Sequence, residues 1–192
     1  MKKLLTIIML AIVTSYGTAN AQHINWGIKG GVNIANLSPD YNPKSGLLVG
    51  LLAHIHLSKQ VALQPEIFYS NQGARYTTAG VETKLKLHYV AVPLLFQYMF
   101  DNGFRVQAGP QVSFLMGAQS ETNLTNSDTQ NNLNNTDVAL SVGAGYVQPS
   151  SGFGIDVRYN AGLTNIKVDK ATKLTNNVFQ LSVFYIFKHH RN

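Results

Sequence analysis

The sequence predicts an all-β fold, namely an eight-stranded antiparallel up-and-down transmembrane β-barrel preceded by a cleaved signal peptide. Three observations predict it. Apolar and polar residues alternate with period two in eight segments, and short and long connections alternate between them. Only 12% of the residues are charged, although 45% are apolar. This composition suits a barrel whose outer face meets lipid and whose lumen holds small polar side chains.

Residues 1–21 have the features of a secretory signal peptide. Two lysines precede an apolar run over residues 4–13, and Ala19 and Ala21 form a small-residue cleavage site. The run is shorter than the roughly 20 residues that a membrane-spanning helix requires. We therefore expect residues 22–192 to form the mature outer-membrane barrel domain, beginning at Gln22.

Charge and cysteine content exclude two classes of function. Two of the 15 lysines and arginines lie in the signal peptide, so 13 remain against nine acidic residues and the mature net charge is +4. This excess is modest and scattered along the chain, which argues against a nucleic-acid partner. The chain has no cysteine, so disulfides and thiol chemistry are excluded.

The alternation is clearest over residues 24–34. Ile24, Trp26 and Ile28 lie on one face, whereas Asn25 and Lys29 lie on the other. Such a period predicts a strand between two different environments. Seven further segments show this alternation: 47–57, 61–73, 83–99, 104–114, 138–146, 153–163 and 179–187. In segment 83–99 it is unclear past Pro93 which residues share a face.

The connections between these segments predict the orientation of the barrel. Three are short, at about residues 58–60, 101–103 and 148–152. The other four are longer, at about residues 35–45, 74–82, 118–136 and 167–176. Periplasmic turns are short and extracellular loops are long in outer-membrane barrels, so both termini should lie on the periplasmic side. The asparagine-rich stretch 118–136 should be a mobile external loop and a candidate partner contact.

The polar face of the strands favours a lipid-exposed barrel over a soluble one. A lipocalin-like barrel turns its apolar face inward, and its outer face is rich in Lys and Glu. Here the polar face consists mainly of Gly, Asn, Gln and Ser. Aromatic residues near the strand ends fit interfacial girdles; they are Trp26, Tyr98, Phe104, Tyr146, Phe153, Tyr185 and Phe187.

Three prolines fall within predicted strands. Pro65, Pro93 and Pro110 each remove a donor from the backbone ladder, and a closed barrel has no edge strand to accommodate them. We interpret them as positions of β-bulges.

The sequence holds no pattern typical of an enzyme or of a cofactor site. His54 and His56 share one face, but no third metal ligand can be placed beside them. Ser113, His88 and Glu66 supply the residue types of a lipid hydrolase, but their spacing does not support that chemistry. We therefore expect neither catalytic residues, nor a metal, nor a cofactor.

Five charged residues lie mid-strand on the polar faces of four strands: Lys29, Glu66, Arg105, Asp156 and Arg158. An Arg or Lys that faces lipid at the bilayer midplane costs about 2–4 kcal/mol, so these residues should point into the lumen. An unpaired charge in a narrow lumen is also costly. We therefore expect a charge network in which Glu66 and Asp156 bridge the three cations and fill the lumen.

Several strings of the sequence resemble the PorT-like, or porin-family, outer-membrane β-barrel proteins. They are LQPEIFYSNQG (63–73), HYVAVPLLFQY (88–98), AGPQVSFLMGA (108–118) and RYNAGLTNI (158–166). The final FQLSVFYIF (179–187) is similar to the last strand that such proteins present to the barrel-assembly machinery. One departure is that the chain continues past Phe187 with KHHRN. The resemblance implies a location in the Gram-negative outer membrane, with membrane lipid and the assembly machinery as partners.

The favoured function is a structural or interaction role through long surface loops, with a lumen filled by polar and charged side chains. The alternatives are a narrow pore for ions or small solutes and a soluble lipocalin-like ligand-binding barrel. An eight-stranded barrel is just wide enough for side chains to fill its interior, so a wide channel is disfavoured.

Overall fold

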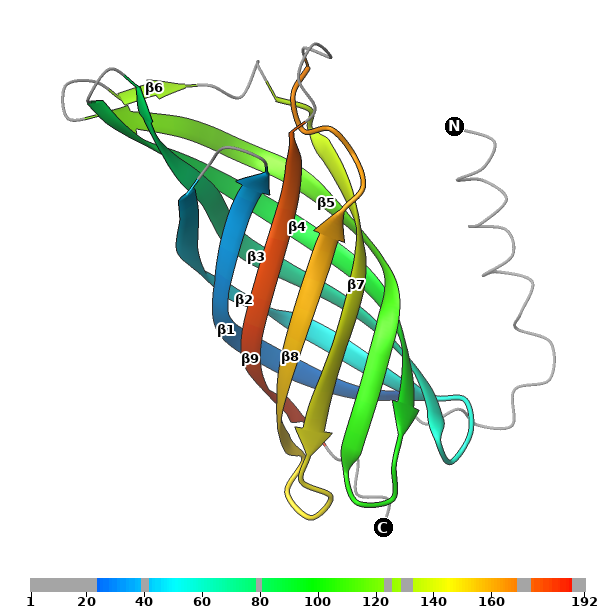
Figure 1. The fold of residues 1–192 in the computed structure, drawn as a ribbon. Helices are drawn as coiled ribbons and strands as arrows, with labels where there is room; N and C mark the ends of the chain where they lie inside the picture. Colours follow the sequence, from blue (N-terminus) through cyan, green and yellow to red (C-terminus); the bar gives the residue numbers. More distant parts are fainter. Residues whose placement is uncertain are drawn as a thin grey trace, which may run out of the picture.

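A computed structural model describes residues 24–38, 42–78, 81–122, 126–128, 133–168 and 174–187. Nine strands form a single antiparallel sheet that closes on itself (Figure 1). They are β1 (Ile24–Ser38), β2 (Asn42–His56), β3 (Val61–Thr78), β4 (Val81–Met99), β5 (Phe104–Thr122), β6 (Asn126–Asp128), β7 (Thr136–Val147), β8 (Phe153–Gly162) and β9 (Thr175–Ile186). The described residues contain no helix that is long and apolar enough to cross a bilayer.

Eight of the strands form the barrel, and β6 is an addition to one of them. Each barrel strand pairs with its neighbour in chain order, and β1 pairs with β9 to close the ring. The short β6 pairs only with the end of β5, over residues 119–121. The predicted eight-stranded antiparallel topology is therefore confirmed.

The alternation of the sequence becomes the difference between the outside and the inside of the barrel. In β1, Trp26 and Ile28 have exposures of 62% and 48%, whereas Lys29 and Asn33 have 3% and 0%. In β4 buried and more exposed residues keep alternating on both sides of Pro93, which is itself buried, so the inward and outward faces of this strand are now clear. A soluble lipocalin-like barrel is excluded, because its apolar side chains would point inward.

The three short connections gather at one end of the barrel, together with the start of β1 and the end of β9 (Figure 1). They cover residues 57–60, 100–103 and 148–152, close to the expected positions. Aromatic rings contact each other beside these turns, as in the pairs Tyr98–Phe100 and Phe104–Tyr146. A girdle of this kind is typical of a membrane interface.

The opposite end of the barrel differs from the prediction, because two expected loops are largely paired strands. Residues 74–78 and 81–82 continue the β3–β4 ladder, and residues 118–122 extend β5. Likewise Ala35 pairs with Lys44 inside the first expected loop. Beyond the bilayer the outward face of a strand meets polar surroundings, so the apolar outward face disappears although the ladder continues. Residues 123–125 and 129–132 of the asparagine-rich stretch lie outside the described residues.

The extension makes the barrel asymmetric. β3, β4 and β5 have 18, 19 and 19 residues, whereas β8 has 10. A transmembrane strand needs about 9–11 residues, so β8 is just long enough. The long strands exceed this by about eight residues, or roughly 25 Å along the strand at 3.3 Å per residue. We call the part formed by residues 72–78, 81–88 and 116–122 the extended wall.

The prediction that the strand prolines mark bulges is wrong. The register is the same on both sides of Pro65, Pro93 and Pro110. The two register shifts lie elsewhere, between residues 43 and 48 of β2 and between residues 88 and 89 of β4. Each N–H of an antiparallel strand bonds to only one of its two neighbours. A proline therefore removes one bond on one side, and the other ladder keeps the register.

Candidate functional site

The structure brings the five predicted charged residues together inside the barrel. Lys29 of β1, Glu66 of β3, Arg105 of β5, and Asp156 and Arg158 of β8 all point into the lumen, with exposures of 0–3%. Each occupies a polar position of its alternating strand, so the pleat of the sheet directs it inward. Their side chains meet because the barrel is narrow enough for opposite walls to be in contact.

Glu66 is the centre of this network. Its Oε2 and Oε1 accept hydrogen bonds from Nη1 and Nη2 of Arg158, both at 2.9 Å. Such a two-pronged pairing of guanidinium and carboxylate is the strongest ion-pair geometry in proteins. Oε1 also accepts a bond of 2.7 Å from Gln64, and Oε2 lies 3.4 Å from Nζ of Lys29. Glu66 therefore ties together β1, β3 and β8.

Asp156 provides the second anionic centre. Its Oδ1 and Oδ2 lie 3.2 and 3.1 Å from Nζ of Lys29, and Ser182 donates a bond of 2.9 Å to Oδ1. The guanidinium groups of Arg105 and Arg158 approach Oδ2 to 3.8 and 3.9 Å. Lys29 therefore bridges the two carboxylates, and three cations share two anions. The network carries a net charge of +1.

Arg105 links the charged layer to the apolar layer below it. Its Nη1 lies 3.4 Å from the Oε1 atoms of Gln64 and Gln97, and its guanidinium carbon lies 4.1 Å from the centre of the Phe184 ring. Phe184 packs with Leu52 and Ile186 in a buried cluster at the turn end of the barrel. This contact combines cation–π attraction with the packing of a flat group on a ring.

A second apolar cluster fills the lumen at the end opposite the short turns. Leu133, Ile166 and Leu174, which come from the connections, pack there against buried side chains of β1, β3, β4 and β5. The backbone N–H of Ile166 donates to the carbonyl of Leu174 at 2.9 Å, which joins the two sides of the last connection. The charge network therefore lies between two apolar clusters, one at the turn end and one at the opposite end of the lumen.

Parity would have identified several lumen residues that the sequence prediction missed. Phe184 and Ile186 share the parity of Ser182, and Leu52 shares the parity of His54. They were not assigned to the lumen because apolar side chains were expected only outside. Gln64 was recognisable as a polar-face residue, whereas Gln97 lies past Pro93, where the parity was unclear, and only the barrel register places both beside Arg105.

The remaining sequence candidates do not form a site. The rings of His54 and His56 lie 4.6 Å apart, and His54 pairs with Gln64. No group of three or more His, Cys, Asp or Glu side chains in the described part of the chain is arranged to hold a metal. Ser113 faces the lumen, whereas His88 is hydrogen-bonded to Tyr69 on the outer face. The serine and the histidine therefore lie on opposite sides of the wall.

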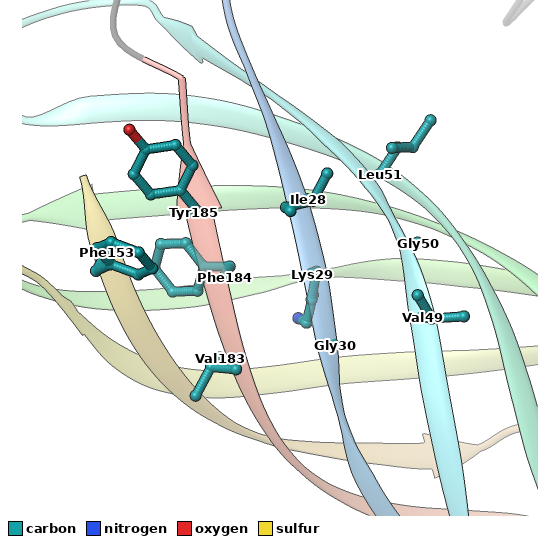
Figure 2. Close-up of a pocket in the computed structure, with 10 residues that line it drawn as sticks. All are labelled: Ile28, Lys29, Gly30, Val49, Gly50, Leu51, Phe153, Val183, Phe184 and Tyr185. Carbon is teal, nitrogen blue, oxygen red and sulfur yellow. The ribbon is translucent and has the colours of Figure 1, made fainter. Parts of the chain in front are cut away.

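The outer wall has a groove of about 600 Å³ over β2, β1, β9 and β8 (Figure 2). Gly30 forms its floor because this outward position of β1 has no side chain. Ile28, Val49 and Leu51 stand on one side, and Phe153, Val183 and Tyr185 stand on the other. The groove offers hydrocarbon contact and almost no polar group, as expected of a lipid-facing surface.

A family model described as outer membrane protein beta-barrel domain matches residues 20–168. The chain belongs to this family. It is thus a small eight-stranded barrel of the Gram-negative outer membrane, and membrane lipid surrounds it. The family match places it among outer-membrane barrels in general and does not distinguish the PorT-like group.

Solved structures with the same fold have low sequence identity. Neisserial surface protein A is 15% identical with a TM-score of 0.60, and the match covers 86% of this chain and 100% of that one. Ail of Yersinia pestis, solved in complex with the heparin analogue sucrose octasulfate, is 13% identical with a TM-score of 0.53. That match covers 86% of this chain and 99% of Ail. No curated protein is similar in sequence at a significant level.

Proposed function

We propose that this protein is a non-conducting outer-membrane barrel that acts through contacts at the cell surface. One observation carries the proposal: a buried ion-pair network crosses the lumen between two apolar clusters. A solute that moved through the barrel would have to separate Glu66 from Arg158 and displace Phe184. The part of the molecule left for function is then its extracellular surface, above all the extended wall.

Two finer points belong to this proposal. The strings over residues 63–73 and 88–98 support membership of the PorT-like group within the family. The alternating, aromatic-rich β9 supports delivery to the barrel-assembly machinery through its last strand. A crosslinker placed at Val183, which is exposed on β9, tests the second point by trapping the assembly machinery during biogenesis.

Planar-bilayer recording of the purified, refolded barrel tests the proposal directly. We expect no steady conductance above that of the bare bilayer for the native sequence. Replacement of Glu66 by glutamine removes the partner of Arg158 and raises the net charge of the network to +2, so any conductance that appears should be anion-selective. Steady conductance of the native protein would refute the proposal and support a narrow pore.

A further inference from the structure

The extended wall carries a cluster of cations on its outward face. Arg75 of β3 is directly opposite Lys84 of β4, and Lys84 is directly opposite Glu121 of β5. These residues form one row across the neighbouring strands. In the next outward-facing row towards the membrane, Lys86 of β4 is opposite Gly73 of β3 and Gln119 of β5. Arg75 and Lys84 are exposed. Neighbouring residues of opposite parity, such as Ala74 and Leu87, are fully buried in the apolar cluster of the lumen, so the charged row faces away from the barrel.

A fourth cation joins the cluster from β2. The register shift between residues 43 and 48 alters the course of β2 beside β3. The side chain of Lys44 passes close to Gly73: a Cβ added at Gly73 would lie 3.3 Å from Cδ of Lys44. The Nζ of Lys44 donates a hydrogen bond of 3.1 Å to the backbone carbonyl of Gln72. Burial, together with repulsion from Lys86 and Arg75, lowers the pKa of Lys44. Positive charge is therefore in excess around it.

Among the side chains that the structure describes at this place, one carboxylate, that of Glu121, faces these four cations. Glu121 lies 2.7 Å from Nζ of Lys86, and the hydrogen bond from Lys86 holds the pKa of Glu121 below its ordinary value. The cluster of Lys44, Arg75, Lys84, Lys86 and Glu121 therefore has a net charge of +3. Like charges directly opposite each other on neighbouring strands destabilise a sheet. The pair formed by Arg75 and Lys84 thus costs stability, and a bound anion would offset that cost.

The height of the cluster indicates which anion it meets. On the outward face the apolar residues of β3 and β4 end at Tyr69 and Val90, and the Asn71–His88 row follows. The rows of Lys86 and Lys84 lie one and two steps above that row, about 7 and 13 Å along the strand. With a strand tilt of about 40°, these rows are roughly 5 and 10 Å above the hydrocarbon edge, which is the headgroup region.

We propose that this cluster binds the phosphate groups of a phosphorylated glycolipid in the outer leaflet. The cluster points sideways into the headgroups and not into the barrel mouth. Arg75 supplies a planar fork that suits phosphate oxygens, and the lysines supply additional charge. The inference requires that the barrel lies in the outer membrane with the extended wall on its outer side, and it holds whether or not the lumen conducts.

The test uses the full barrel in phosphatidylcholine nanodiscs with diphosphoryl lipid A as the probe, and native mass spectrometry measures occupancy. Each cation near a charged membrane surface changes binding about fivefold. The double variant Arg75→Gln/Lys84→Gln should therefore bind about 25-fold more weakly, whereas Glu121→Gln should bind more tightly. Lys59→Gln is the matched control, because Lys59 is an exposed lysine in the turn at the opposite end. It should bind as the native barrel does.

Removal of the opposed Arg75–Lys84 pair relieves repulsion, so the double variant should keep its heat-modifiable gel migration, and a loss of binding will not reflect unfolding. Dephosphorylated lipid A should not occupy the native barrel. Equal loss in Lys59→Gln, or unchanged binding in the double variant, would overturn the proposal. A third result would also overturn the proposal. If inorganic pyrophosphate bound the native barrel in lipid-free detergent as tightly as lipid A does, the site would serve a soluble anion.

Discussion

Replacement of Glu66 by glutamine should destabilise the barrel severely. The side chain keeps its size but loses its charge, so Arg158 loses both of its 2.9 Å bonds to a carboxylate. Asp156 cannot replace Glu66, because its closest approach to Arg158 is 3.9 Å and it already pairs with Lys29. Removal of one partner of a buried ion pair costs about 3–5 kcal/mol. The free energy of unfolding should fall by that amount.

Urea unfolding in phospholipid vesicles, followed by heat-modifiable gel migration, measures this change. The double variant Glu66→Gln/Arg158→Gln should recover part of the loss, because no guanidinium is then left without its partner. Glu121→Gln provides the matched control, since it removes a carboxylate from an exposed ion pair outside the bilayer, and it should shift the urea midpoint far less than Glu66→Gln does.

A loss below about 1 kcal/mol for Glu66→Gln would refute the reasoning, since this is the range of an exposed ion pair. Strict additivity of the two substitutions would also refute it, because residues that contact each other should be energetically coupled.

Four further outcomes are expected. Gly30→Ala should stabilise the barrel by about 0.5–1 kcal/mol, because the added Cβ would meet no atom closer than 3.9 Å. Gly31→Ala should destabilise it by about 1–3 kcal/mol, because the added Cβ would lie 2.3 Å from a backbone carbonyl oxygen of β9. Equal urea midpoints for the two variants would contradict this prediction. Since the pKa of Glu121 is lowered, its ion pair stabilises the wall at neutral pH and is lost as the pH falls through a value below 4.5. NMR titration should show this lowered pKa, and Lys86→Gln should bring it closer to the ordinary value, because Lys86 is the main cause of the shift. Intact mass of the exported protein should place its N-terminus at Gln22, and proteinase K added to whole cells should cut first within residues 118–136, so a retained 4–13 segment or full protection would contradict these two predictions.

The sequence alone was sufficient to predict the closed barrel and the direction of its side chains. A strand has an unambiguous period of two, and a shift by one residue would expose every polar group to lipid. The same reasoning predicts that Lys29, Glu66 and Arg158 point into the lumen. The energetic penalty for a charge in hydrocarbon leaves no other position for these residues.

Local pattern could not predict where the strands end. Residues 74–78 and 118–122 lack an apolar outward face, so they resemble loops, yet cross-strand backbone bonds extend the sheet through them. The prolines were misinterpreted for a related reason. The consequence of a missing N–H depends on which neighbouring strand it would have faced, and a sequence contains no information on neighbours.

Only the tertiary structure determined which charges lie together. Lys44, Arg75, Lys84 and Glu121 are dispersed along the chain, and by composition the positive charge appeared scattered. The register of β2 to β5 brings them into one cluster on the extended wall. In the lumen, likewise, the sequence determined that Glu66 and Arg158 point inward, but closure of the ring determined that they pair. Alternation is a local property of the chain, whereas the choice of partner depends on strand register and barrel diameter.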